Sequence, residues 1–568
     1  MAVLLAWVDF AGREIDPAII EKLKSRVLER AAGSVQELRA PGRYLLSIQT
    51  RAFSHAPTLR LDPERWLLQD SEHAFHRFER WPDQAAALVL VEPNRVHLCR
   101  DRLGQRPLCY GLLDGGVLVA SGDALVASHP DIDARLDDDY LADYFSAQIP
   151  QPSASVFRGV RLVPAGTALT IDGTGVAMHP APAAPIEGAF GWSDEEAVVR
   201  FRTLFDQAIN ASCRGAKRIG ISLSGGLDSS SLVPQLAADT IAITHGSASF
   251  VDSDERPLAR ELAEQFGFHA IGLDADNYLP LSGALREAQP DEPSATPYRE
   301  IKTRAYELWR EHGVDVVLSG NFADHLNAGH YYWLDDDWRR GRWRDIARTL
   351  RFLAGQGLTA LWRDTGWRGF VRRRLNWTPS FRLTWLRPEL RASREVARAA
   401  ALAAYAHWPR PDQAAQALGA YAAGDAAECF FADRYGMEVR QPYRHWPLVQ
   451  TMLSLPTDKS WRRGTDKWLV RKALAGTLPD RWRCRPKSAD LTPFLRSALQ
   501  KKISQVRNLL ELGQPTWSRF VDRQTVDQAL ALDSDENLLL IWLLAAYGLW
   551  QQSRDADGQK VALSVNSL

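Results

Sequence analysis

The chain has 568 residues and a net charge of zero, with 69 Lys plus Arg against 69 Asp plus Glu. The length exceeds what one compact core usually holds, so we expect at least two domains. A protein built to hold nucleic acid usually carries a clear positive excess, so the balanced charge argues against a nucleic-acid partner. The apolar N-terminus meets Asp9 early, and no apolar run reaches the roughly 18 residues needed to span a bilayer. We therefore predict no membrane association.

The cysteines are spread along the chain without a CxxC pair: Cys99, Cys109, Cys213, Cys429 and Cys484. Their odd number and their spacing argue against a disulfide framework and against a zinc site. This use of cysteine is typical of a reducing compartment, and we expect a cytoplasmic protein.

The first third of the chain shows the pattern of a β-rich domain. Short apolar runs alternate with turn residues, at 44–48, 85–91, 95–99, 117–120 and 168–171. A stiff Pro/Ala stretch follows at residues 179–185. We place the domain boundary there, with an N-terminal domain over residues 1–186 and a C-terminal domain over residues 187–568.

Strands alternate with helices at the start of the second domain. Ser193 and Glu196 form a capping-box pattern before a helix that continues to about Ile209. Further apolar runs predict strands at 218–223, 240–244 and 314–318, and another helix opening at Leu232. This alternation predicts a parallel sheet covered on both faces, followed by a mostly helical remainder. The predicted fold class is α/β, a β-rich N-terminal domain followed by a parallel-sheet domain with helical additions.

The loop at residues 224–230, Ser-Gly-Gly-Leu-Asp-Ser-Ser, carries the sharpest chemical signal. Its two glycines let the backbone approach a ligand, its serines add hydroxyl donors, and the helix expected after it favours an anion. Open α/β sheets bind ligands at this end of a strand. The loop lacks the Gly-Lys-Ser/Thr ending of a Walker A motif. We predict a phosphate or pyrophosphate cradle; the alternative is a serine-rich turn before a helix.

This loop resembles the pyrophosphate loop of the ATP-pyrophosphatase group, which includes asparagine synthetases, β-lactam synthetases and lasso-peptide cyclases. Members of that group split ATP between its α and β phosphates. The resemblance implies that the loop binds the pyrophosphate end of ATP and that Asp228 helps to hold Mg²⁺. ATP and Mg²⁺ are therefore the expected cofactors.

Further segments resemble the asparagine-synthetase-like branch of this group. They are an Asp-Glu step at 254–255, a Ser-Gly-x-x-x-Asp segment within 318–325, a Gly-x-Glu-x-Arg-x-Pro-Tyr segment at 436–443, the Gly-x-x-Lys-x-x-x-Arg spacing of Gly464, Lys467 and Arg471, and an Arg-x-Lys at 485–487. The resemblance places Asp324 on the second magnesium aspartate. At the same segment Phe322 replaces a glycine and His325 replaces the usual glutamate.

The resemblance also implies the remaining site residues. Lys487 would stabilise the oxyanion of the second step, and Glu438 would orient a partner or accept a proton from the attacking amine. Taken singly, a glutamate or a lysine is more often a structural or surface charge than a catalytic group, and it is the motif context that favours a catalytic role for these two. Asn321 stands where β-lactam synthetases carry a tyrosine beside that glutamate, so no equivalent dyad is evident. The implied ATP and pyrophosphate site consists of Ser222, Leu223, Ser224, Gly225, Gly226, Asp228, Ser229, Ser230, His245, Gly246, Ser319, Gly320 and Lys467, with Asp228 and Asp324 as metal ligands.

Residues 99–110 resemble the Arg-Asp-x-x-Gly-x-Arg-Pro-Leu-x-Tyr stretch of the glutaminase domain of these synthetases, an Ntn-type sandwich. Such a glutaminase uses a cysteine at its mature N-terminus as nucleophile. Here residue 2 is Ala and the first cysteine is Cys99. We therefore expect a degenerate glutaminase-like domain that serves as scaffold.

Loss of the glutaminase removes the ammonia source, so the nucleophile should be an amine on the substrate itself. β-Lactam synthetases and lasso-peptide cyclases share this loss. The length of the chain and the Trp/Arg-rich segment 331–395 favour a lasso-peptide macrocyclase. It would adenylate an Asp or Glu side chain of a core peptide for attack by the peptide's N-terminal amine. The expected partners are the precursor peptide, a leader peptidase and a leader-binding protein.

Alternatives stay open at this point. The segment 331–395 is either helix packing with a solvated basic face or a wall that holds a peptide or a partner. The enzyme is alternatively another amide or β-lactam-type synthetase, including an ammonia-dependent asparagine synthetase. An inactive peptide-binding scaffold is the alternative from another class, and the intact loop at 224–230 argues against it.

Overall fold

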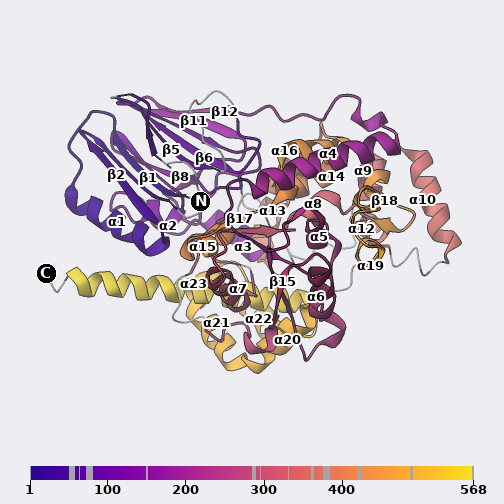
Figure 1. Ribbon diagram of the computed structural model, residues 1–568. Helices are drawn as coiled ribbons and strands as arrows, with labels where there is room; N and C mark the ends of the chain where they lie inside the picture. The colour runs from indigo at the N-terminus through magenta and orange to yellow at the C-terminus, as the bar shows by residue number, and fades with distance from the viewer. Residues whose placement is uncertain are drawn as a thin grey trace.

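The structure is a computed structural model. It describes residues 2–49, 58–62, 64–71, 81–148, 151–283, 289–294, 296–330, 332–357, 359, 364–374, 384–419, 425–486 and 490–565. Lys487, one of the predicted catalytic residues, lies outside the described residues. Figure 1 shows the strands of the N-terminal domain, in indigo and purple, beside a mostly helical C-terminal part.

The N-terminal domain is built from two antiparallel sheets. Their strand orders are β10-β8-β9-β1-β3-β2 and β12-β11-β7-β6-β5-β4. The strands are β1 (Ala2–Asp9), β2 (Ser34–Ala40), β3 (Arg43–Gln49), β4 (Thr58–Arg60), β5 (Trp66–Ser71), β6 (Ala86–Val91), β7 (Arg95–Arg100), β8 (Cys109–Leu113), β9 (Gly116–Ala120), β10 (Arg161–Leu162), β11 (Thr167–Asp172) and β12 (Gly175–Pro180).

Alternation along β1 explains how the sheets pack. Leu4 and its neighbours on one face of β1 join Val89 and Leu98 of the second sheet in one core, which makes the domain a sandwich. Leu5 and its neighbours on the other face pack under α1 (Pro17–Arg30). α2 (Asp123–Ala127) and α3 (Asp138–Phe145) complete this part of the chain. The predicted β-rich domain is confirmed.

The connector after β12 leads into α4 (Asp194–Cys213), and the predicted boundary between residues 186 and 187 lies within it. The predicted capping box is confirmed. Ser193 Oγ accepts a hydrogen bond from the Glu196 N–H at 3.1 Å, and the Ser193 N–H donates to the Glu196 carboxylate at 2.7 Å. These two bonds satisfy amide groups that the first turn of a helix leaves without partners.

The C-terminal part contains a five-stranded sheet in the order β15-β14-β13-β16-β17, and all its paired strands are parallel. The strands are β13 (Ile219–Ser222), β14 (Ile241–Gly246), β15 (His269–Asp274), β16 (Val316–Ser319) and β17 (Glu438–Arg440). The chain moves from β13 to β14 on one side and returns to β16 on the other. The carboxyl ends of β13 and β16 therefore flank a switch point, the position where open α/β sheets bind ligands.

Apolar layers cover both faces of this sheet, as predicted. On one face Ile221 and Leu318 pack with α4, α6 (Arg256–Gln265) and α16 (Trp446–Ser454). On the other face Ile243 and Val317 pack with α7 (Arg299–Glu311) and α15 (Asp425–Arg434).

The helix predicted to open at Leu232 is wrong. The loop is followed by α5 (Leu227–Ser230), a single turn, and then by a 3-10 turn at Val233–Gln235. Pro234 lies in this 3-10 turn and has no backbone N–H, which disfavours a continued helix. A long helix dipole is therefore not part of the anion site.

The remainder is mostly helical, as predicted, and no helix within the described ranges combines the length and the apolar character needed to cross a membrane. Its further helices are α8 (Ala323–Asn327), α9 (Trp333–Arg339), α10 (Trp343–Gly355), α12 (Thr365–Arg374), α13 (Pro388–Ala403), α14 (Pro411–Ala414), α17 (Thr457–Ser460), α18 (Trp468–Ala473), α19 (Asp480–Arg483), α20 (Thr492–Lys501), α21 (Ile503–Trp517), α22 (Arg523–Ala529) and α23 (Asp535–Val565).

Two features of this helical part matter for the site. α23 packs against α3, where the Phe145 and Tyr547 rings lie 5.2 Å apart, so one apolar core joins both domains. α9, α10 and α12 pack around Trp333, which stacks on Trp461 at 5.1 Å. The packing interpretation of segment 331–395 thus holds for the inner faces of α9, α10 and α12, and α10 lies at the outer edge of the molecule (Figure 1).

Candidate active site

The loop 224–230 follows β13 directly, and hydrogen bonds to its own serine side chains fix its conformation. The Ser224 N–H donates to Ser229 Oγ at 2.9 Å, and the Gly226 N–H donates to Ser224 Oγ at 3.2 Å. A side chain at Gly225 would place its Cβ 2.5 Å from the Arg485 guanidinium. A side chain at Gly320 would meet the backbone of Asp228 and Ser229 at 2.7 to 3.0 Å. Glycine is therefore required at position 320, where the contacts are backbone atoms, whereas a side chain at position 225 would have to displace the Arg485 guanidinium.

Asp228, Asp324 and Lys467 converge beside this loop. Lys467 Nζ lies 2.6 and 2.7 Å from the two Asp228 carboxylate oxygens and 2.6 Å from Asp324 Oδ1. Burial lowers the pKa of Lys467, but the charges of the two carboxylates outweigh this and leave the pKa above its usual value. The Lys467 side chain is 9% exposed, whereas that of Asp324 is 45% exposed. The cluster is thus sealed on the lysine side and open to solvent on the Asp324 side.

The donor set fits a Mg²⁺ ion. Mg²⁺ in nucleotide sites takes one or two carboxylates together with waters and phosphate oxygens. Three oxygens of Asp228 and Asp324 already surround one cationic atom, so their geometry suits a cation without rearrangement of the backbone. No group of three or more His, Cys, Asp or Glu side chains suited to a metal occurs in the described part of the chain, so phosphate would have to complete the shell.

In the segment after β16, Phe322 has a backbone conformation that is typical of glycine. Phe322 has φ of 76°, in the left-handed region that a bulky residue seldom adopts. Its ring is buried, and the Arg444 guanidinium lies 5.3 Å above it. This packing offsets the backbone cost and sets the start of α8, which carries Asp324. The same helix turns His325 toward Gln416, whose amide nitrogen lies 3.4 Å from His325 Nδ1.

The other predicted nucleotide residues lie at the same edge of the sheet. Ser222 pairs in register with Ser319, and the Leu223 N–H donates to the Ile243 carbonyl at 2.9 Å. His245 and Gly246 end β14, the neighbouring strand, and burial lowers the pKa of His245. The structure therefore brings together the predicted nucleotide residues from β13, β14 and β16. Their contact with ATP stays a prediction.

Three residues outside the predicted set support the loop. Arg485 donates to the Gly225 carbonyl at 2.8 Å and to Glu255 at 2.6 Å. The Tyr443 hydroxyl lies 2.8 Å from Ser231 Oγ, which donates to the Asp228 carbonyl at 2.6 Å. The family-like segments of the sequence contain all three residues, Arg485, Glu255 and Tyr443. The motifs therefore included them but did not assign them a role at the loop.

Glu438 is not part of this cluster. It opens β17 level with Val316, the first residue of β16, whereas the loop follows the last residues of its strand. Glu438 is fully buried between Arg106 of the N-terminal domain, to which it hydrogen-bonds, and Arg440 at 2.7 Å. Burial would raise the pKa of Glu438, but the guanidiniums of Arg440 and Arg106 hold it far below its usual range. This placement favours a structural role for Glu438, and its predicted catalytic role stays a prediction.

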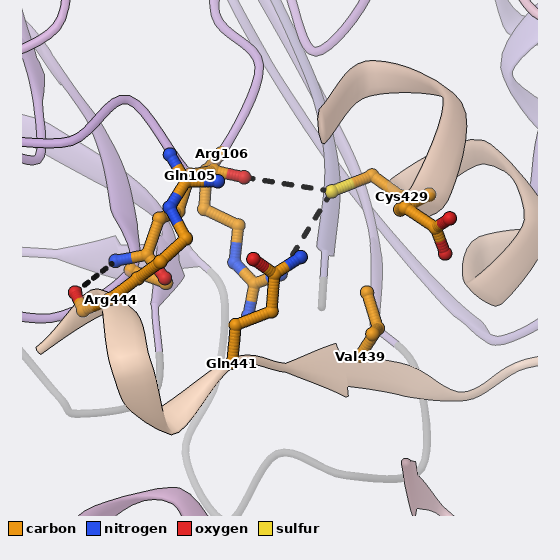
Figure 2. A pocket seen from close by; sticks show the side chains of 8 residues that line it. Gln105, Arg106, Cys429, Val439, Gln441 and Arg444 are labelled. Carbon is orange, nitrogen blue, oxygen red and sulfur yellow. Dashed lines mark hydrogen bonds between the residues drawn. The ribbon is translucent and has the colours of Figure 1, made fainter. Parts of the chain in front are cut away.

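Figure 2 shows a small cavity next to this ion-pair cluster, at the junction of the two domains. Its volume of about 10 Å³ is room for a single water. The lining residues include Gln105, which donates to the Arg444 carbonyl at 3.3 Å, and Cys429, whose thiol faces the Gln105 carbonyl at 3.7 Å. It is too small for a nucleotide and lies away from the loop 224–230, so we interpret it as a packing gap between the domains.

Comparison with known proteins agrees with this arrangement. The asparagine synthase family model matches residues 200–552, more than half of the chain, and a glutamine amidotransferase domain model matches residues 84–180. The chain therefore belongs to the asparagine synthase family, which consists of ATP-utilising, amide-forming enzymes. It combines a glutamine amidotransferase domain of the Ntn type with an asparagine synthase domain built on a parallel sheet.

Two curated relatives are asparagine synthetases of Bacillus subtilis (strain 168). Asparagine synthetase [glutamine-hydrolyzing] 3 is 24% identical over 508 residues, covering 81% of this chain and 77% of that protein. Asparagine synthetase [glutamine-hydrolyzing] 1 is 24% identical over 533 residues, covering 85% and 80%. Among solved structures, a B. subtilis glutamine phosphoribosylpyrophosphate amidotransferase shows 11% identity over 48% of this chain and 81% of that one. Its TM-score of 0.22 is too low to support an inference.

The glutamine amidotransferase domain of this chain holds no activated cysteine. The sequence places two cysteines within residues 1–186, and both are buried strand residues. Burial raises the pKa of Cys99 to about 12 and also raises that of Cys109. Because the thiolate is the reactive form, neither side chain is suited to act as a nucleophile.

Proposed function

We propose that this protein uses ATP and Mg²⁺ to activate a substrate carboxylate as an acyl-adenylate and then joins it to an amine. The carboxylate oxygen attacks the α-phosphorus of ATP, and the bond to the β-phosphate breaks, releasing pyrophosphate. The amine nitrogen then attacks the acyl carbon, gives up a proton and displaces AMP. The observation that supports this most is the convergence of Asp228 and Asp324 on one cation position beside the loop 224–230.

The residues of this cluster have separate tasks in the proposed reaction. Mg²⁺, when bound by Asp228 and Asp324, neutralises charge on the departing pyrophosphate. Lys467 lies close enough to supply a further positive charge to the phosphates, and Arg485 fixes the loop through the Gly225 carbonyl. Once ATP and Mg²⁺ are bound, these groups would be in place before the chemical step, so they would stabilise charge without reorganisation during that step.

We further propose that the amine belongs to the substrate and that the product is the macrolactam ring of a lasso peptide. The buried, unreactive thiols of Cys99 and Cys109 support an amine source other than glutamine. The segment formed by α9 and α10 exposes Trp338 and Trp343, at 39% and 53%, beside several arginines, and offers a surface for a peptide. A precursor peptide, a leader peptidase and a leader-binding protein are the corresponding proposed partners.

Formation of asparagine is the second candidate, because the two curated relatives carry that name. It requires aspartate and an ammonium source instead of a peptide amine. The two candidates share the adenylation step and differ in the nucleophile, so one set of reactions separates them.

The test uses the full chain with ATP, Mg²⁺ and a panel of synthetic linear peptides. Each peptide has an unblocked N-terminus and a single Asp or Glu at a varied position. We expect AMP and pyrophosphate release together with loss of one water from the peptide, measured by mass spectrometry. The matched control is the same peptide with an acetylated N-terminus, which can be adenylated but not cyclised.

Three outcomes are informative. Product from aspartate and ammonium, with none from the peptides, would replace the macrolactam proposal by asparagine synthesis. Activity restored only by glutamine would show that the N-terminal domain is a working glutaminase. Absence of AMP and pyrophosphate with every acid would overturn adenylation itself and leave a binding scaffold.

A further inference from the structure

Lys467 occupies the place of a cation between the two aspartates. An ammonium group has three N–H donors, and Nζ lies within 2.7 Å of three carboxylate oxygens. Such distances are typical of charge-assisted hydrogen bonds. Every donor of Lys467 is therefore used by Asp228 and Asp324, and none is left for a phosphate.

The chain holds Lys467 in this position from both sides. Its backbone adopts φ of 54°, a left-handed conformation that disfavours lysine and that persists only where the surroundings impose it. The neighbouring Asp466 accepts a hydrogen bond from the Gly329 N–H at 3.0 Å and lies 3.0 Å from His330. Lys467 directly follows a short hairpin, β18 (Trp461–Arg462) and β19 (Thr465–Asp466). The contacts of Asp466 connect this hairpin to the segment after α8, the helix on which Asp324 lies.

One point in space cannot hold both the ammonium and a divalent cation. If Lys467 is to reach pyrophosphate, it must release at least one carboxylate oxygen. If Mg²⁺ is to reach the carboxylates, the ammonium must move aside. Both requirements are met by the same displacement, in which the nucleotide's phosphates attract the lysine while the metal takes its place.

We propose that Lys467 is an internal substitute for the metal ion. In the nucleotide-free protein it neutralises Asp228 and Asp324 and excludes divalent cations. It moves to the phosphates when ATP binds. Metal and nucleotide therefore bind tightly together, and the affinity for each one alone is low. This inference rests on the proposed function for the identity of the nucleotide. It adds a coupling between metal binding and nucleotide binding, which the proposed function does not require.

The experiment measures Mn²⁺ binding by electron paramagnetic resonance, with the full chain and no nucleotide. We expect weak binding to the unaltered protein and binding tighter by roughly tenfold or more to Lys467→Met. The matched control is Lys472→Met, because Lys472 lies on α18, which begins directly after Lys467, is exposed and faces Trp468 rather than a carboxylate. Lys467→Gly gives a second variant, which removes the amine and also relieves the left-handed backbone.

A second arm uses the unaltered protein alone and does not depend on a variant that folds. Mn²⁺ affinity is measured with and without α,β-methylene-ATP, which cannot be cleaved between its α and β phosphates. We expect the analogue to tighten Mn²⁺ binding by roughly tenfold or more, and Mn²⁺ to tighten binding of the analogue equally.

The results separate failure of this inference from failure of the proposed function. Equal Mn²⁺ affinity with and without the analogue, or tight binding to the nucleotide-free protein, would overturn the role of Lys467. That role is also overturned if folded Lys467→Met or Lys467→Gly binds Mn²⁺ no better than Lys472→Met. Coupled binding of Mn²⁺ and the analogue, without AMP release from any acid, would instead support this inference and refute adenylation.

Discussion

Two ion-pair clusters lie at opposite edges of the same parallel sheet. At the carboxyl edge one ammonium, Lys467, stands between two carboxylates, and the Asp324 side chain is 45% exposed. At the amino edge one carboxylate, Glu438, stands between two guanidiniums and is fully buried. The first cluster has an excess of negative charge and access to solvent. In the second, Asp70 and Glu438 balance the two guanidiniums, and the side chains have no access to solvent.

This difference distinguishes a ligand-binding site from a structural ion-pair cluster. An open cluster with surplus carboxylate can take up a further cation together with an anionic ligand. A sealed cluster of paired charges has no room for a ligand, and its arginines also contact other groups of the protein. Arg440 donates to the Ser212 and Arg214 carbonyls at 2.9 and 2.7 Å, and Arg106 also lies 3.7 Å from Asp70. Glu438 thus ties the sheet to the end of α4 and to the N-terminal domain.

Removing the charge of Asp228 should break the open cluster and have the largest effect on activity. We expect Asp228→Ala to lower ATP–pyrophosphate exchange about a thousandfold, because a metal ligand supplies several kcal/mol of charge stabilisation. The protein should stay folded, since Asp228 lies beside solvent. The control is Asp239→Ala, an exposed carboxylate in the turn before β14. Undiminished exchange in folded Asp228→Ala would remove the loop from the proposed site.

Glu438→Gln should break the sealed cluster and act on stability instead. It leaves two buried guanidiniums without their counter-charge, which costs about 3 kcal/mol of unfolding free energy. We expect a lower midpoint in urea unfolding and unchanged ATP–pyrophosphate exchange per folded molecule. Glu264→Gln, on the exposed face of α6, should change neither. Loss of exchange at full stability would return Glu438 to the catalytic set.

The sequence predicted features that rest on local chemistry. The capping box at Ser193 and Glu196, the strand before the loop 224–230 and the alternation typical of a parallel sheet depend on neighbours along the chain, and the structure confirms them. The helix expected from Leu232 failed for a local reason as well, because its spacing was counted across Pro234.

The features that the sequence left out depend on contacts between distant segments. Arg485 reaches the Gly225 carbonyl across 260 residues, and Arg106 reaches Glu438 across 332. A motif tells which residue types recur together, but it does not tell at which edge of a sheet each one lies. For that reason the family resemblance named both Asp324 and Glu438 as site residues, although Asp324 lies beside the loop and Glu438 at the other edge of the sheet.

Asp324→Asn should weaken the open cluster without breaking it. Its carboxylate is half solvated, and a hydrogen bond to a charged group contributes roughly 2 kcal/mol, so exchange should fall about thirtyfold. The Mg²⁺ concentration that gives half of the maximal rate should rise in the same variant. An effect as large as that of Asp228→Ala, with no change in the Mg²⁺ requirement, would contradict a metal-binding role for Asp324.

Tyr443→Phe should have the smallest effect, because it touches the open cluster only through another residue. The Tyr443 hydroxyl lies 2.8 Å from Ser231 Oγ, and that hydroxyl donates to the Asp228 carbonyl at 2.6 Å. Loss of one buried hydrogen bond costs about 1 kcal/mol, which would lower the exchange rate about fivefold if the Asp228 backbone loosens. Tyr405→Phe is the control, because Tyr405 is half-buried and its hydroxyl makes no hydrogen bond to the described residues. If both variants reduce stability equally and neither slows exchange, Ser231 and Tyr443 hold the fold and not the position of Asp228.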